Sequence, residues 1–74
     1  MDKKDWNNEA KTVLKAILAD RNIKYQELAK ALNRIGIEEN YNSISTKLNR
    51  GTFSFAFFLQ CLHALEIDLM ELRF

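Results

Sequence analysis

Asn42–Gly51 reads NSISTKLNRG, and this stretch decides the fold. Ile44 and Leu48 stand four residues apart, which predicts a short helix with one apolar side, and Gly51 ends it. At about 100° per residue, the opposite side of that helix carries polar residues. They are Asn42, Thr46 and Asn49, flanked by Ser43, Ser45 and Arg50. Such a row of short hydrogen-bonding side chains differs from the Glu and Lys mixture that commonly solvates a helix.

Apolar residues at helical spacing extend to both sides of this stretch. Upstream they predict helices over residues 6–20 and 25–35, the second ending at Gly36. The helix over 6–20 places Trp6 as a plug at the end of the core and takes Asp5 or Asn8 as its cap. Between residues 35 and 42 the polar segment IEENYN predicts a turn, with Asn40 or Asn42 capping the next helix.

Downstream, Thr52 or Ser54 opens a fourth helix that runs to about residue 66, and Asp68 can cap a last turn over 69–74. The inward residues expected of the fourth helix are Phe55, Phe58, Leu59, Leu62 and Leu65. Apolar residues cover a wider arc of this helix than packing within a monomer requires, which indicates a dimer interface. That interface would comprise Phe57, Cys61, Ala64, Leu69, Met70 and Phe74. Alternatively, the apolar tail covers the surplus within one chain.

The composition predicts one all-α domain over residues 1–74, a compact bundle of four to five helices with residues 1–5 as a flexible tail. Of the 74 residues, 47% are hydrophobic, none is proline and two are glycine. No apolar run approaches the roughly 18–20 residues that span a bilayer, and no signal peptide is recognisable. A single cysteine forms no internal disulfide, so we expect a cytoplasmic protein.

Catalytic and metal-binding patterns are missing from the sequence. It contains no Ser/His/Asp set and no glycine-rich phosphate loop, and His63 has no partner at metal-ligand spacing. Cys61 is expected to be a small buried hydrophobe rather than a reactive thiol. We therefore expect no enzyme, no cofactor, no metal and no small-molecule substrate.

Three segments in order resemble the Cro and phage-repressor family of helix-turn-helix proteins, the lambda-repressor-like regulators of bacteria and phages. They are ILADRNIKYQELAKAL (17–32), NSISTKLNRG (42–51) and FFLQCLHALEIDLMEL (57–72). The resemblance covers about residues 10–72. GTFSFAFFLQCLHAL (51–65) is also similar to a small uncharacterised bacterial domain family related to these repressors.

The resemblance implies a transcriptional regulator, a repressor-like homodimer that is nucleoid-associated when it binds double-stranded DNA. Residues 42–50 would be the recognition helix in the major groove. The expected base-reading residues are Asn42, Ser43, Ser45, Thr46 and Asn49. The expected phosphate contacts are Lys24, Tyr25, Lys47 and Arg50, although Arg50 is equally placed to pair with a local carboxylate or carbonyl.

Two features depart from the family pattern. Tyr25 stands where the family has a phosphate-binding glutamine, with Gln26 shifted by one. The segment leading to Arg50 and Gly51 is several residues longer, through LNRIGIEEN, which could tilt the recognition helix. The resemblance implies the fold and the docking of the recognition helix in the major groove. The family's individual base contacts do not carry over to residues of this sequence.

A second class of function competes with DNA binding. A protein-interaction module could keep the helix-turn-helix fold and bind a partner through its Phe-rich fourth helix. The net charge of only +1, with Glu38 and Glu39, favours that alternative. The polar stripe and the cations of the second and third helices favour DNA. A basic face around Lys24, Lys30, Lys47 and Arg50 would support DNA binding.

Overall fold

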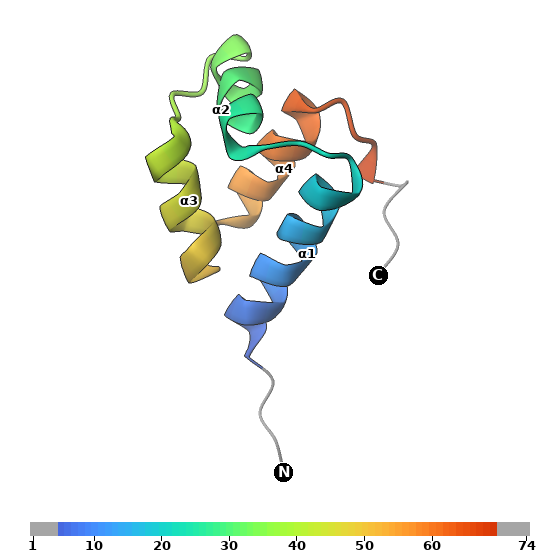
Figure 1. Cartoon of the computed structure of the whole chain (residues 1–74), viewed down its shortest axis with the longest axis vertical. Helices are drawn as coiled ribbons and strands as arrows, with labels where there is room; N and C mark the ends of the chain where they lie inside the picture. Colours follow the sequence, from blue (N-terminus) through green and yellow to red (C-terminus); the bar gives the residue numbers. More distant parts are fainter. Residues whose placement is uncertain (1–4, 70–74) are drawn as a thin grey trace.

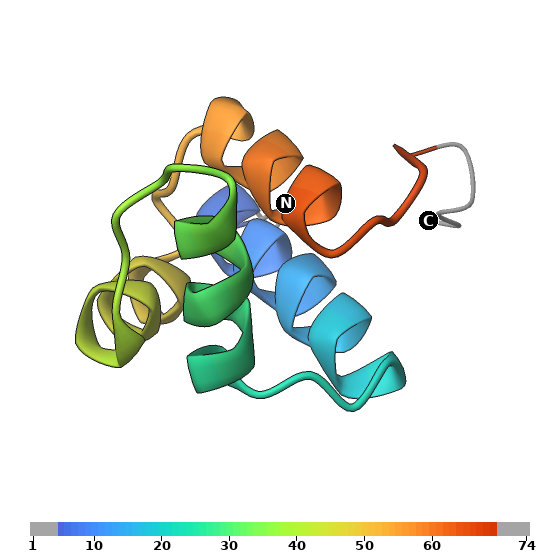
Figure 2. The same cartoon turned by 90° about the horizontal axis from the view of Figure 1, so that it is seen from above.

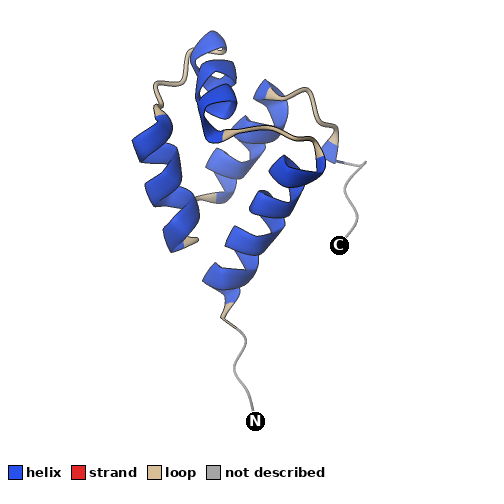
Figure 3. Ribbon diagram, viewed as in Figure 1, coloured by secondary structure: helices blue, strands red, loops and turns tan. Residues whose placement is uncertain are grey.

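Four helices form the part of the chain that this computed structural model describes, residues 5–69. They are α1 (Trp6–Asp20), α2 (Tyr25–Arg34), α3 (Tyr41–Arg50) and α4 (Phe55–Ala64), and the described residues include no strand (Figure 3). The predicted all-helical fold is confirmed, with helix bounds within about two residues of those expected. The predicted tail overlaps the described range only at Asp5, which caps α1.

Three helices begin at a short polar side chain that accepts a backbone hydrogen bond. The N–H of Asn8 donates to Asp5 Oδ1 at 3.0 Å, and that of Ser43 donates to Asn40 Oδ1 at 2.9 Å. At α4 the N–H of Phe57 donates to the hydroxyl oxygen of Ser54 at 2.9 Å. Each of these caps satisfies a backbone donor that the first turn leaves without a helical partner.

Three helices also end in one repeated motif. A left-handed residue follows the C-cap, and the next residue is an isoleucine whose N–H donates to a carbonyl five residues earlier. The left-handed residues are Asn22, Gly36 and Glu66, and the isoleucines are Ile23, Ile37 and Ile67. Each isoleucine packs against the core, so the motif joins the ends of α1, α2 and α4 to the interior.

α2 lies at the centre of the packing. It contacts both α3 and α4, while α1 packs against α3 (Figures 1 and 2). The core between them is almost entirely aliphatic. Its buried residues are Leu14, Leu18, Leu28, Ala29, Leu32, Ile44, Leu48, Phe57 and Cys61.

The orientation of α4 differs from the sequence expectation. Phe57 is 5% exposed and Cys61 is fully buried, so both belong to the core, and their assignment to a dimer interface is wrong. Conversely, Phe55 and Leu59, expected inside, are 66% and 39% exposed. The reason is that α4 is apolar on nearly every side, so its contact with α2 decides which stripe is buried.

The other predicted interface residues have different positions. Ala64 is half-buried and packs against the core, Leu69 is exposed, and Met70 and Phe74 lie outside the described residues. Trp6 is 69% exposed, so its predicted role as a core plug is wrong as well. Within residues 5–69, no helix combines the length and apolar character needed to cross a bilayer.

Candidate nucleic-acid interface

The outward side of α3 is a polar surface built on a fully buried apolar base. Ile44 and Leu48 are both 0% exposed and fix the rotation of the helix. Asn42, Thr46 and Asn49 consequently face solvent, as predicted. α3 lies at one edge of the molecule in both views, so this side is accessible (Figures 1 and 2). We call Asn42, Thr46 and Asn49 the outer row.

One end of the outer row is joined to α1. Lys15 Nζ donates to Asn49 Oδ1 at 3.3 Å, and Asn49 Nδ2 donates to the hydroxyl oxygen of Ser45, also at 3.3 Å. Both bonds are long, and they hold the Asn49 amide at the surface. The sequence analysis did not include Lys15 among the site residues, because 34 positions separate it from Asn49.

Two tyrosines meet where α2 and α3 begin. The ring centroids of Tyr25 and Tyr41 are 5.9 Å apart and tilted by 46°, and Tyr41 is 51% exposed. Burial raises the pKa of Tyr25 above its ordinary value, and the neighbouring Tyr41 raises it further. Lys24, which precedes Tyr25, is exposed. Tyr41 was missed because it lies in the polar, asparagine-rich segment IEENYN, which predicted a turn.

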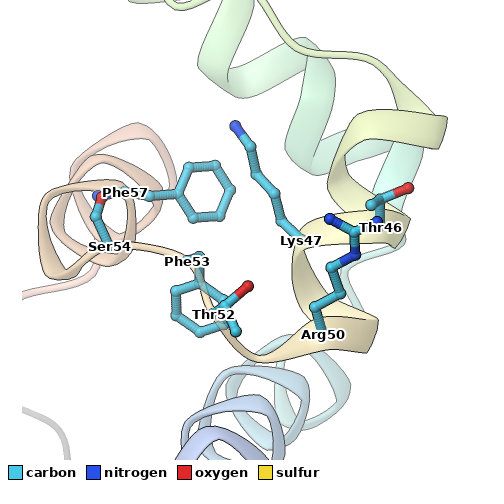
Figure 4. A pocket seen from close by; sticks show the side chains of 7 residues that line it. All are labelled: Thr46, Lys47, Arg50, Thr52, Phe53, Ser54 and Phe57. Atoms are coloured by element: carbon cyan, nitrogen blue, oxygen red, sulfur yellow. The ribbon is translucent and has the colours of Figure 1, made fainter.

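Lys47 does not point toward the outer row. Its ammonium pairs with Glu39 and lies 4.6 Å from the centroid of the Phe57 ring (Figure 4). The Glu39 side chain is only 5% exposed, so this carboxylate depends on Lys47 for compensation. The Lys47 cation is thus paired within the molecule, so we do not count it among the proposed phosphate contacts.

Ser43 serves the start of α3. Its hydroxyl accepts from the Asn40 N–H at 3.0 Å and lies 2.6 Å from Glu39 Oε1, to which it donates. This reciprocal pairing is a capping box, with Ser43 in the place of the usual Glu or Gln. The Ser43 hydroxyl is thus engaged in the cap and with Glu39, so we do not count Ser43 among the outer row.

A pocket of about 290 Å³ lies between α3 and the start of α4 (Figure 4). Its polar lining includes Thr46, Arg50, Thr52 and Ser54, and none of the described residues that line it is acidic. Arg50 is exposed beside Thr46 of the outer row. The structure thus brings a guanidinium and three hydroxyls to one side of α3, a set of hydrogen-bond donors suited to an anion.

Cys61 has no access to reagents. It is fully buried, and burial, with Glu39 nearby, raises the pKa of its thiol to about 12 despite the opposing effect of Lys47. The expectation of a buried small hydrophobe is confirmed. Among residues 5–69, no group of three His, Cys, Asp or Glu residues is arranged to hold a metal ion.

Comparison with known proteins gives one match. Residues 6–70 match the model of a family described as a domain of unknown function, DUF6471. No curated protein and no solved structure matches the chain.

Proposed function

This chain belongs to the DUF6471 family, and we propose that it is a DNA-binding regulator that presents the outward side of α3 to the major groove. The observation that carries the proposal is the outer row. Asn42, Thr46 and Asn49 are exposed along one side of a helix whose other side is fully buried. Asparagine pairs bidentately with adenine, and threonine offers both a hydroxyl and a methyl group to base edges.

The relation of α2 to α3 supports a helix-turn-helix. The two helices pack together and are joined by residues 35–40, in the order that resembles the Cro and phage-repressor regulators. The connection is long, but Glu39 ties it to both helices. The N–H of Glu39 donates to Asn33 Oδ1 at 3.0 Å, and the Glu39 carboxylate pairs with Lys47. Such bracing gives α3 a fixed position despite the longer turn.

Phosphate contacts come from three helices in this proposal. Lys24 and Tyr25 stand at the start of α2, and Arg50 stands at the end of α3. Lys15 of α1 lies within hydrogen-bond distance of Asn49, so it reaches the same side. Cations on both flanks of a polar row are the arrangement by which phosphate contacts fix register while side chains read bases. With a net charge of only +1, binding should be modest and strongly salt-dependent.

The test is a fluorescence-anisotropy titration with a labelled random-sequence duplex. We expect binding at about 50 mM salt that weakens by at least tenfold at about 200 mM, because released counterions supply much of the affinity. The protein should remain folded at both salt concentrations, as checked by circular dichroism. No binding at the lower salt would contradict the proposal.

An alternative function is a protein-interaction module that does not bind DNA. The observation that favours it is the exposure of Phe55 and Leu59 on α4. Exposed apolar patches mark interaction surfaces in soluble proteins. The same titration separates the two functions, since a module of this kind has no affinity for the duplex at low salt.

A further inference from the structure

An apolar groove of about 350 Å³ separates α1 from α4. Its apolar lining consists of Trp6, Ala10, Val13, Phe53, Phe55 and Phe58. α1 and α4 pack less closely along their backbones than the pairs α1 and α3, α2 and α3, or α2 and α4 do within the described residues. Deeper in the molecule, Ile17 and Leu62 close the space between the two helices. Toward solvent it stays open.

The rim of this groove and the surface beside it expose several large apolar side chains. Trp6 and Phe55 line the groove and are 69% and 66% exposed. Leu59 lies outside the lining, one helical turn after Phe55, and is 39% exposed. Since an aromatic side chain has about 150–250 Å² of surface, these three residues present on the order of 350 Å². Contiguous apolar patches of about this size are often functional.

We propose that the groove binds a second copy of this chain in a two-fold symmetric dimer. A symmetric contact requires one surface to supply both the projecting group and the cavity that receives it. This surface has both, because the Phe55 ring borders the groove and projects from it. The dimer goes beyond the proposed DNA binding and does not depend on it.

Charge also favours a second copy over a charged partner. Among the described residues that line the groove, Glu9 is the only ionisable one. A basic or acidic partner would find little charge to complement, whereas a symmetric pair brings together only two carboxylates in an otherwise neutral contact. A near-neutral apolar surface is typical of interfaces between identical subunits.

The surface area that two copies would bury indicates how tightly they associate. Two copies would bury on the order of 700 Å² of apolar rim, and the polar border raises the total toward about 1,000 Å², the low end for specific interfaces. We therefore expect dissociation in the micromolar range rather than a permanent dimer. The segment Phe53–Ser54 lines both this groove and the pocket beside Arg50, so the dimer contact would adjoin the α3 surface in each copy.

Sedimentation equilibrium of the full chain without DNA tests the dimer. We expect the mass to rise from 8.7 kDa toward twice that value between about 1 μM and 1 mM protein. Emission of Trp6, the one tryptophan, should shift to the blue over the same range as the indole leaves water. Phe55→Glu should weaken dimerisation at least tenfold, because it places a carboxylate in the contact.

The matched control is Gln60→Glu, which adds the same charge to an exposed position of α4 that does not line the groove. It should leave the dimer unchanged. A monomer at every concentration would overturn the proposal, and the groove would then be open to a different partner. A dimer that survives Phe55→Glu would equally overturn it, since another surface would hold the copies together. Neither result bears on DNA binding.

Discussion

The backbone of Gly51 passes directly against that of Asn7. A Cβ atom at position 51 would lie 2.0 Å from the carbonyl oxygen of Asn7, which is far inside the contact distance. Gly51 also has a φ of 67°, a left-handed conformation that side chains disfavour. One residue thus ends α3 and lets α1 approach it, so the position of the outer row depends on Gly51.

Replacing Gly51 should therefore lower the free energy of unfolding more than replacing Gly36 does. Gly36→Ala introduces only left-handed strain, about 1–2 kcal/mol, because no atom lies within 4 Å of the added Cβ. Gly51→Ala adds a clash with backbone that cannot rotate away, and we expect a loss of at least about 3 kcal/mol in the free energy of unfolding. Urea denaturation measures both. Equal losses would show that α1 and α3 do not meet at this point.

Substitutions at Lys47 and Arg50 should affect different properties, the first the stability of the fold and the second the binding of DNA. Arg50→Gln should reduce the log–log salt slope of binding by about 0.9 per copy while leaving the fold intact. Lys47→Gln should leave that slope unchanged and lower the free energy of unfolding by about 3 kcal/mol, because Glu39 stays buried without its cation. Anisotropy titrations and urea denaturation give the two readouts. If the salt slope of binding falls with Lys47→Gln, Lys47 contacts a phosphate after all.

Glu66 offers a stabilising substitution. It has a φ of 58°, in the left-handed region that a glutamate adopts only with strain. Glu66→Gly should raise the free energy of unfolding by about 1 kcal/mol, since the residue is exposed and glycine relieves the strain. Asn22→Gly, with a φ of 56° at the end of α1, is the control with a smaller gain, because asparagine tolerates this conformation. A loss of stability in Glu66→Gly would contradict the assigned motif.

Cys61 should make the protein less stable in alkali. Its thiol has a pKa of about 12 in the folded chain against 9.0 for the ordinary value, so the unfolded chain releases the proton first. The stabilisation is complete below about pH 9 and is lost as the pH rises toward 12. Unfolding measured at about pH 8 and pH 11 should show a smaller decline in Cys61→Ala than in the parent. An identical decline would mean that the thiol is not shielded.

Helix ends and the rotation of α3 could be predicted from the sequence because both have local causes. Short polar residues cap the starts of α1, α3 and α4, glycines follow α2 and α3, and α3 has only two apolar positions to bury. The rotation of α4 could not be predicted, since Phe55, Phe57 and Phe58 are equally apolar and only contact with α2 selects among them. Pairs such as Lys47 with Glu39 join a helix to the connection that precedes it, and no periodicity relates them.

The central claim is that the outer row reads DNA sequence, and selection of bound duplexes from a random pool tests it most directly. The parent protein should enrich a defined motif. A variant with Asn42→Ala, Thr46→Ala and Asn49→Ala should stay folded and lose that motif, at about 1–3 kcal/mol for each bidentate contact removed. If the triple variant enriches the same motif as the parent, or the parent enriches none, α3 is not the recognition helix.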